Sequence, residues 1–308
     1  AFFLRFVDVR VLTPSIDEDH VRVPITPQTC RLRDLTYSAP VEVDVQYTRG
    51  KEIVLKRGVP IGRIPIMLRC DACVLNRKNE AQLAKLGECP LDPGGYFIIK
   101  GTEKVILIQE QLSKNRILVE IDSKGQVCAN VQSSTAERKS RTSVAVKGNR
   151  MYLKHNSLTE DVPVVVVLRA MGMESDQEIA QLVGTEPKFT HVLAPSIEDC
   201  ISLKVFTTQQ ALRYIGGRIR RSKPGGMNII DSARETLASV VLAHVPVVAY
   251  NFRHKCIYVG QMLRRMIMAM HDPTTVDDRD YYGNKRLELA GQLVSILFED
   301  LFKKFCSD

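Results

Sequence analysis

The sequence predicts an α+β fold in which strands dominate the first part of the chain and helices the second. Segments rich in β-branched residues, separated by Gly and Pro, fill roughly the first 120 residues, and helical apolar periodicity dominates after about residue 170. The 308 residues are 44% hydrophobic and 25% charged, which is typical of a well-packed chain rather than a disordered one. This length suits one large domain or two of ordinary size.

The expected strands follow alternation or short apolar runs. Residues 41–47 alternate between Val or Tyr and polar side chains, as in a strand with one buried face. The run Ile64–Leu68 contains Pro65, so we place it at a sheet edge or a strand start. The continuous apolar run Val164–Leu168 is typical of a buried strand. Further strands are expected at 117–121, 127–131 and 143–147.

The clearest turn lies at Pro90–Gly95. Pro93 presets φ for its first central position, and Gly94 supplies the positive φ of a type II turn. We expect Tyr96–Ile99 and Val105–Ile108 to form a hairpin across the Gly101-Thr102 pair. The Walker phosphate-loop pattern is missing, so Gly94, Gly95 and Gly101 indicate turns rather than a nucleotide site.

The expected helices begin and end at capping residues. Asn79–Leu86 is closed by Gly87, and the capping box Ser175–Glu178 starts a helix that ends at Gly184. Asn251 is the expected N-cap of a helix that Pro273 stops. The remaining helices are expected at 196–203, 207–215, 229–243, 252–270 and 287–305.

Net charge and cysteine content indicate the kind of partner and the cellular compartment of the protein. The formal net charge of +8 favours an acidic partner such as nucleic acid, although many basic proteins bind none. The eight scattered cysteines predict reduced thiols in a nuclear or cytosolic protein. No run of about 18 apolar residues is present, so we expect no membrane span or membrane partner. The first residue is not Met, and both ends look like cuts within a longer chain.

Three segments together resemble signatures of the second-largest subunit of multisubunit RNA polymerases. They are Ile61–Arg69, Glu88–Val105 and Asp277–Leu287, in the order and at the spacing of that family. Gln109–Arg116 and Ala170–Glu178 look like the versions found in eukaryotic RNA polymerase III. The resemblance extends over essentially the whole chain.

The resemblance implies a domain organisation. It implies a mixed strand and helix protrusion domain at 1–117, an inserted α+β lobe domain at 118–277, and a returning part of the protrusion at 278–308. In the family these domains form one wall of the DNA cleft.

It also implies a role within a DNA-directed RNA polymerase, a nucleotidyltransferase of the nucleus. The expected partners are the largest and other polymerase subunits, the DNA template, with the RNA–DNA hybrid as a further candidate, and initiation or termination subunits on the lobe. We expect no catalytic residue and no cofactor in this chain, because in the family the catalytic Mg²⁺ is held mainly by the largest subunit.

Two features of the third segment are candidate sites. Asp277, Asp278 and Asp280 are the residue type that Mg²⁺ prefers, but basic neighbours can neutralise them, and we expect them instead to form the N-terminal turn of the last helix. Lys285 and Arg286 are candidates for phosphate contacts, with ion pairs to the nearby aspartates as the equal alternative. Replacing both by alanine is expected to lower the salt dependence of DNA binding by about one or two phosphate contacts. Arg279 is a further candidate, and Gly283 belongs to the turn.

Two basic clusters are weaker candidates for nucleic-acid contacts, because no aromatic residues lie among them to stack on bases. Arg138, Lys139 and Arg141 are placed in a loop between strands. The second cluster, in a Gly-rich loop after a helix, comprises Arg218, Arg220, Arg221 and Lys223.

The cysteine spacing is a poor match to a zinc site. Cys70 and Cys73 have the spacing of one half of such a site and Cys89 follows, but no second pair completes four ligands. We therefore expect incidental cysteines.

The equivalent region of another nuclear RNA polymerase is an alternative to the polymerase III assignment. Two other classes of function also stay open. One is a stand-alone module that binds protein, and the other is a small metalloenzyme built on the Asp turn or the cysteines.

Overall fold

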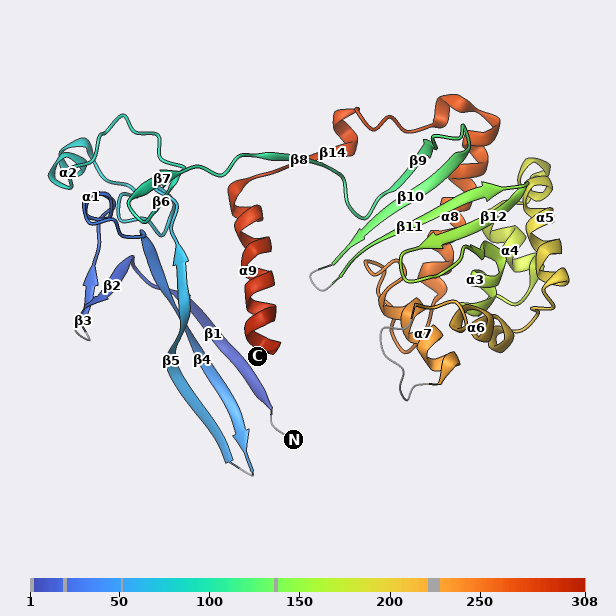
Figure 1. Ribbon diagram of the computed structural model, residues 1–308, viewed down its shortest axis with the longest axis horizontal. Coiled ribbons are helices and arrows are strands. Elements are labelled where there is room, and N and C mark those ends of the chain that lie inside the picture. Colours follow the sequence, from blue (N-terminus) through green and yellow to red (C-terminus); the bar gives the residue numbers. More distant parts are fainter. Residues whose placement is uncertain (1–2, 19–20, 51, 136–137, 221–227, 308) are drawn as a thin grey trace. The chain divides into compact units, whose positions relative to one another are not determined.

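The computed structural model describes residues 3–18, 21–50, 52–135, 138–220 and 228–307. The chain forms two compact units: residues 1–108 with 289–291, and residues 109–288 with 292–308. Strands and helices are segregated as the predicted α+β class requires (Figure 1). The protrusion and lobe boundaries stay a prediction.

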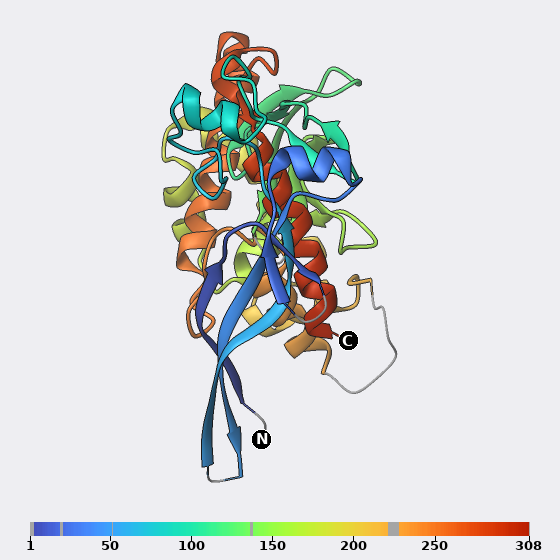
Figure 2. The same cartoon turned by 90° about the vertical axis from the view of Figure 1, so that its left-hand side faces the viewer.

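The first unit is built on a three-stranded antiparallel sheet in the order β1-β4-β5. Its strands are β1 (Leu4–Val11), β4 (Ser38–Arg49) and β5 (Glu52–Pro65). The latter two form the long twisted ribbon seen in Figures 1 and 2. The predicted strand at 41–47 is confirmed within β4. Ile64 and Pro65 lie at the end of β5, an edge strand of the sheet, so the sheet-edge alternative for this run is confirmed and the strand start is not.

Short elements complete the first unit. They are β2 (Ser15–Glu18), β3 (Val21–Pro24), α1 (Pro27–Leu32), α2 (Glu80–Lys85), β6 (Phe97–Ile99) and β7 (Thr102–Lys104). The predicted short helix near 79–86 is confirmed as α2. Cys30, Tyr37, Leu68 and Ile98 are fully or almost fully buried at the centre of a small core.

The predicted hairpin is present, but its second strand is β7 and not Val105–Ile108. Ile99 pairs with Thr102, so the turn consists of Lys100 and Gly101 alone, both at positive φ. A Cβ atom on Gly101 would lie 2.4 Å from Asp34 Oδ1, so this turn requires glycine.

The second unit contains a five-stranded antiparallel sheet in the order β13-β12-β11-β10-β9. The strands are β9 (Ile117–Ile121), β10 (Val127–Ser134), β11 (Lys139–Lys147), β12 (Arg150–His155) and β13 (Val162–Pro163). The strands predicted at 117–121, 127–131 and 143–147 are therefore confirmed. One face of the sheet carries Val119, Ala129, Val131, Val144 and Leu153 into the core.

Helices cover that inner face. They are α3 (Val164–Ala170), α4 (Asp176–Val183), α5 (Pro187–Ser202), α6 (Thr208–Gly216), α7 (Ile229–Ser239) and α8 (Arg253–His271). The remaining elements of the unit are β8 (Gln109–Leu112), η1 (Pro273–Thr275), η2 (Tyr282–Asn284), β14 (Lys285–Glu288) and α9 (Ala290–Ser307), the last starting at the boundary between units. None of the described helices is long and apolar enough to cross a membrane.

The strand predicted at 164–168 is wrong, because this run is the helix α3. All seven of its residues are buried. A segment buried on every side shows neither the period of a helix nor that of a strand, so composition favoured the wrong element.

Three helix starts also differ from the prediction. α5 begins at Pro187 rather than at 196, and the N-cap of α8 is Phe252 rather than Asn251. The last helix begins at Ala290, because the residues before it form the strand β14.

Candidate nucleic-acid interface

Two segments that the sequence singled out separately lie side by side. β14 pairs antiparallel with β8, so that Lys285 lies opposite Leu112. The amide of Ser113 donates to the carbonyl of Asn284 at 2.8 Å, which extends the pairing. We call residues 109–116 and 277–288 the paired segments.

Side chains reinforce this pairing. Lys285 Nζ lies 2.5 Å from Glu110 Oε1 and 3.5 Å from Asp280, and Lys114 Nζ lies 2.9 Å from Glu288 Oε1. Arg116 donates to the carbonyl of Gly283 at 3.2 Å. The hydrogen bond to Glu110 raises the pKa of Lys285. The alternative of an ion pair at Lys285 therefore has geometric support.

Arg286 differs from Lys285. Its guanidinium donates to the carbonyls of Gly283 and Lys285, at 3.1 and 2.8 Å, and the residue is exposed. Among the described residues no carboxylate lies within 4 Å of it. Its charge is available to a ligand, whereas that of Lys285 is shared with two acids.

The acidic turn does not form the N-terminal turn of the last helix, because that helix begins ten residues after Asp280. Asp277 instead binds the edge of the sheet: its carboxylate accepts from the Val119 amide at 2.9 Å and from Arg265 at 2.8 Å. The Asp278 carboxylate accepts from the Asp280 amide at 2.8 Å. These acids hold the segment in place.

Arg279 lies 2.5 Å from Glu120 of β9. Arg141 approaches the same carboxylate at 3.9 Å, and Asn130 donates to it. Glu120 therefore forms a close ion pair with Arg279 and only a long one with Arg141. A Cβ on Gly283 would lie 2.6 Å from the ring of the exposed Tyr281, which would have to move.

The two basic clusters occupy different settings. Lys139 and Arg141 lie on β11 rather than in a loop, and Arg138 comes directly before that strand. Arg218 pairs with Glu160 at 3.1 Å and lies over the ring of Tyr214. Arg220 is exposed. Arg221 and Lys223 lie outside the described residues.

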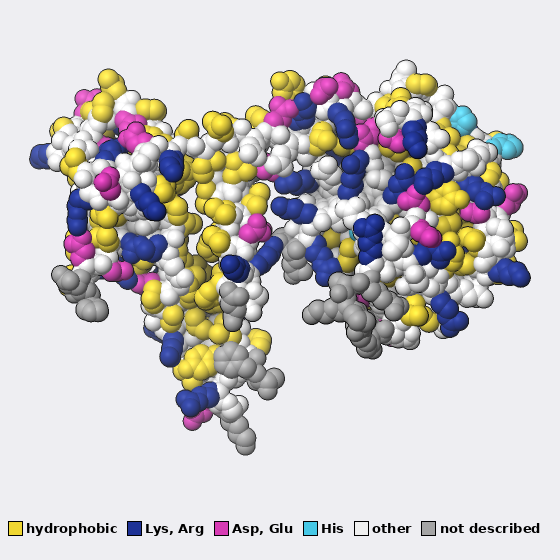
Figure 3. Space-filling model, viewed as in Figure 1, with side chains coloured by type: hydrophobic (Ala, Val, Ile, Leu, Met, Phe, Trp, Pro, Cys, Tyr) yellow, Lys and Arg dark blue, Asp and Glu magenta, His cyan; other side chains and the backbone are white. Residues whose placement is uncertain are grey.

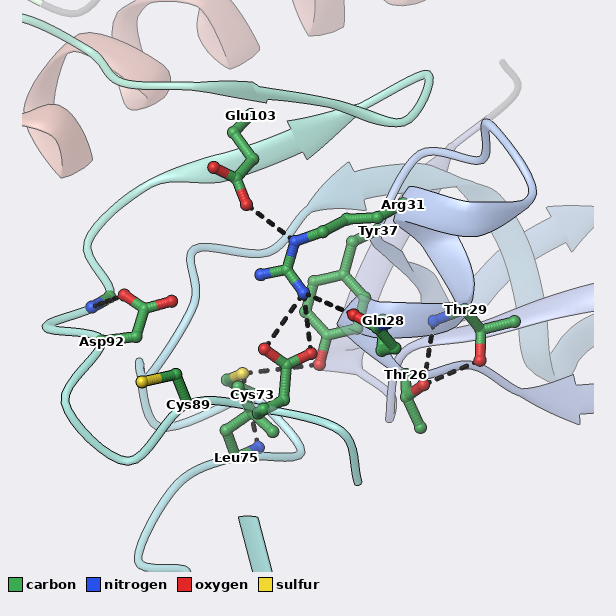
Figure 4. Close-up of polar contacts among 12 residues, drawn as sticks. Thr26, Gln28, Thr29, Arg31, Tyr37, Cys73, Leu75, Cys89, Asp92 and Glu103 are labelled. Atoms are coloured by element: carbon green, nitrogen blue, oxygen red, sulfur yellow. Dashed lines mark hydrogen bonds and ion pairs between the residues drawn. The ribbon is translucent and has the colours of Figure 1, made fainter. Parts of the chain in front are cut away.

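The Pro-Gly turn of the first unit lies beside a half-buried arginine, Arg31 (Figure 4). Arg31 donates to Glu88 at 2.9 Å, to Glu103 at 2.7 Å and to the Tyr96 hydroxyl at 2.7 Å. Tyr96 in turn donates to Asp92 at 2.5 Å. The second segment of the resemblance therefore folds around Arg31 as a structural network.

The titration behaviour of the network fits this role. Burial raises the pKa of Tyr96 to about 12, and its hydrogen bond to Asp92 acts in the same direction. Burial also raises the pKa of Asp92, but hydrogen bonds from Tyr96 and Gly94 outweigh it and leave that pKa below its usual value. Tyr96 is therefore a neutral donor near pH 7.

Positive φ explains both glycines of the turn, and close packing adds a second reason at Gly94. Gly94 and Gly95 both have positive φ, and a Cβ on Gly94 would lie 2.8 Å from the carbonyl oxygen of Leu68. Pro93 precedes them in the irregular stretch before β6.

The cysteines give no sign of a metal centre. Cys73 is buried and its sulfur lies 3.5 Å from the Tyr37 hydroxyl. Over the part of the chain that the structure describes, no group of three or more His, Cys, Asp or Glu side chains is arranged to hold a metal.

Comparison of the amino-acid sequence with known families assigns the chain to one of them. The family described as RNA polymerase beta subunit matches residues 1–308. The chain belongs to that family. The DNA-directed RNA polymerase III subunit RPC2 of Schizosaccharomyces pombe is 58% identical over all of this chain and 27% of its own length.

Other relatives differ in similarity. The RNA polymerase III subunit RPC2 of Saccharomyces cerevisiae is 52% identical, again over the whole chain and 27% of its own length. The RNA polymerase II subunit 2 of Arabidopsis thaliana is 33% identical over 99% of this chain and 28% of its own length. The predicted resemblance to the second-largest subunit of RNA polymerase III is confirmed. The chain spans about a quarter of the length of these relatives.

Several polar residues of the interface were missed from sequence. Lys114 and Glu110 belong to a segment that was noted only for its resemblance. Each forms an ion pair with a residue of β14, about 170 residues later in the sequence. Lys154 is also basic and lies on β12. The alternation of buried Met151, Leu153 and His155 with the less buried Arg150, Tyr152 and Lys154 was the available signal for it.

Proposed function

We propose that this chain is part of the second-largest subunit of nuclear RNA polymerase III, where it holds nucleic acid and docks other subunits without catalysing the reaction. One observation carries the proposal. Five RNA polymerase III subunits are 52–58% identical to the chain over 98–100% of its length, while two RNA polymerase II subunits are 33% identical. Such a difference favours the polymerase III enzyme over its nuclear counterparts.

The proposed contribution to the enzyme is binding and positioning. Exposed cations such as Arg286 supply sequence-independent contacts to phosphate, which a polymerase needs as it moves along its template. The catalytic Mg²⁺ would be held mainly by the largest subunit. Residues 118–277, the proposed lobe, would dock initiation and termination subunits, and 1–117 with 278–308 would form the protrusion.

The test is co-purification from cells. The chromosomal copy of the gene receives an affinity tag, and the captured proteins are identified by mass spectrometry together with the intact mass of the tagged chain. We expect a larger partner subunit and a set of small subunits in constant ratio. The identity of the small subunits distinguishes polymerase III from the other nuclear polymerases.

A tagged protein that elutes alone would contradict the proposal and favour a stand-alone interaction module. The same tag on an unrelated nuclear protein of similar charge controls for nonspecific capture of nucleic-acid-bound material. Nuclease treatment before capture removes partners that are held only through DNA.

A further inference from the structure

Two cysteines of the first unit lie in one tight turn. The amide of Cys73 donates to the carbonyl of Cys70 at 2.9 Å, which is the hydrogen bond that closes a four-residue turn. Such a turn brings its first and fourth Cα atoms within about 7 Å of each other. The Cα atoms of a disulfide are roughly 4.4 to 6.8 Å apart, so the backbone brings these two residues into the range that a disulfide requires.

Both side chains of the pair face the same core. Cys73 is buried in the small core of the first unit, and Cys70 packs against that core while it stays half-buried. The residues between them, Asp71 and Ala72, are exposed. One thiol is therefore within reach of solvent and the second lies behind it, which is the arrangement of a reacting cysteine beside a resolving one.

Two hydrogen-bond donors hold the buried sulfur. The Tyr37 hydroxyl lies 3.5 Å from the Cys73 sulfur (Figure 4), and the Leu75 amide donates to that sulfur at 3.4 Å. Because the Tyr37 oxygen itself accepts from the Val74 amide at 3.1 Å, the hydroxyl hydrogen is free to point at the sulfur. These contacts fix the position of the Cys73 sulfur beside the turn.

The other cysteines have no neighbour of this kind. In the sequence, Cys70 and Cys73 are the one pair of cysteines close enough to share a turn. Cys89 and Cys306 are exposed but stand alone in the sequence. Four further thiols are buried, and burial raises the pKa of each, which leaves them protonated and unreactive near pH 7: Cys30, Cys128, Cys200 and Cys256.

A metal explains the same spacing less well. A structural zinc ion takes four ligands, and in the described parts of the chain no three His, Cys, Asp or Glu side chains are grouped to hold one. A disulfide needs only the two sulfurs that the turn brings together. The pair therefore suits redox chemistry better than metal binding.

The charge of the chain favours an anionic oxidant. The formal net charge is +8, and Figure 3 shows Lys and Arg side chains on the surface of the first unit. Arg77 and Lys78, which follow the turn closely in sequence, are exposed. Glutathione disulfide carries net negative charge at neutral pH, so electrostatic attraction raises its concentration near such a surface.

We propose that Cys70 and Cys73 form a reversible redox pair that a low-molecular-weight disulfide, such as glutathione disulfide, closes. The Cys70 sulfur attacks one sulfur of glutathione disulfide, so that a mixed disulfide forms and one glutathione leaves. The Cys73 sulfur then attacks the Cys70 sulfur, and the second glutathione leaves. The two cysteines lose two electrons and two protons, which the oxidant takes up as two glutathione thiols. Excess glutathione reverses both steps.

The test reads the state of each cysteine by mass spectrometry. The tagged full-length protein is captured from cells under native conditions and incubated with increasing glutathione disulfide at constant reduced glutathione. Acid quenching and alkylation follow. Trypsin cleaves after Arg69 and Arg77 and so releases residues 70–77, which carry both thiols of the pair, while Cys30 and Cys89 fall on other peptides.

The peptide 70–77 is expected to lose two hydrogens and to resist alkylation, and dithiothreitol should reverse both changes. Because the closing step is intramolecular, half oxidation of the pair should need about one-tenth of the glutathione disulfide that modifies half of Cys89. A peptide that stays a dithiol, or only carries glutathione, in buffers that modify Cys89 would overturn the proposal. So would a link from Cys73 to Cys30 or Cys89.

Single variants separate the two steps. Cys73→Ser should trap Cys70 as the mixed disulfide with glutathione, because no second thiol displaces it. Cys70→Ser should leave Cys73 open to alkylation after denaturation, because the buried sulfur does not reach the oxidant. Cys89→Ser is the matched control and should leave oxidation of the pair unchanged. A Cys70→Ser protein in which Cys73 takes up glutathione as readily as the wild-type pair closes would contradict the assigned order.

The wild-type peptide map decides the proposal even if Cys73→Ser does not fold, since it requires no variant. The inference goes beyond the proposed function and does not depend on it. The same tagged protein serves both experiments, but the state of the peptide 70–77 is read whether or not polymerase subunits are captured. Failure of either conclusion is therefore seen separately from failure of the other.

Discussion

At the scale of single residues, Lys255 has the most demanding environment. Its side chain is fully buried, and its ammonium donates to the carbonyls of Leu237, Ala238 and Val241 at 2.6–2.8 Å. Leu237 and Ala238 lie in the last turn of α7, where carbonyls have no donor within the helix, and Val241 directly follows the C-cap. A buried cation thus caps a helix, which is stabilising only because every donor is satisfied.

Replacing Lys255 by methionine is therefore expected to destabilise the chain by about 3 kcal/mol, because three buried carbonyls lose their donor. Urea unfolding measures the loss, and Lys124→Met, at an exposed position, is the control that should change stability by less than about 0.5 kcal/mol. A Lys255→Met chain as stable as the control would show that the three carbonyls find other partners.

The same residue predicts a pH dependence. Burial lowers the pKa of Lys255 to about 8, from 10.5 in the unfolded chain. Between these values the unfolded chain binds more protons than the folded one, so the stability of the wild type should rise with pH. Lys255→Met should lack that rise when unfolding is measured from pH 7 to 11. Parallel curves for wild type and variant would contradict the lowered pKa.

At the scale of elements, a helix or strand could be predicted from the sequence where its burial leaves a local pattern of apolar and polar residues. In the strand around 41–47, Val and Tyr alternate with polar residues, and this alternation identified it. Val164–Leu168 is buried on every side within α3, and its prediction as a strand was wrong. β8 and β14 have four residues each and pair with one another although they are far apart in the sequence. No local pattern therefore predicted them.

The pairing of β8 with β14 separates the roles of two neighbouring cations. Lys285 is engaged by Glu110 and Asp280, while Arg286 contacts only main-chain carbonyls among the described residues. Arg286→Ala should reduce the salt slope of DNA binding by about 1, the value of one phosphate contact. Lys285→Ala should leave that slope unchanged and lower the melting temperature, because the pairing loses its ion pair.

The double variant completes this comparison. Lys285→Ala with Arg286→Ala should show the slope of Arg286→Ala alone. An unchanged slope in the double variant would remove the paired segments from the DNA-binding surface. A slope reduced by about 2 would show instead that Lys285 leaves its acids to bind phosphate.

At the scale of the whole molecule, motifs and composition carried different information. The three segments of the resemblance identified the family, which the match over residues 1–308 confirmed. The net charge of +8 indicated an acidic partner but not where it binds, since that depends on which cations the fold neutralises. Lys147 and Lys154 are seven residues apart on paired strands, yet only Lys147 has a described acid partner. Such differences arise in three dimensions and are not readable from sequence.

The charge distribution of the whole molecule also bears on metal binding. The acidic turn is engaged by Arg265, by Lys285 and by main-chain amides, and the Cys73 sulfur is in contact with Tyr37 and the Leu75 amide. Carboxylates and cysteine sulfurs that already form ion pairs or hydrogen bonds are poor metal ligands, because binding a metal would first break those contacts. We therefore expect the purified chain to hold zinc or magnesium only well below one ion per molecule.

Elemental analysis after dialysis measures this content, and melting with and without EDTA tests its consequence. The melting temperature should be the same in both, and Cys70→Ser with Cys73→Ser should not change the metal content. A stoichiometric metal that EDTA removes, with a fall in melting temperature, would contradict the expectation. Loss of that metal in the double-serine variant would then locate it at the cysteines, whereas its retention would direct attention to the acidic turn and to a metal-dependent activity of the chain itself.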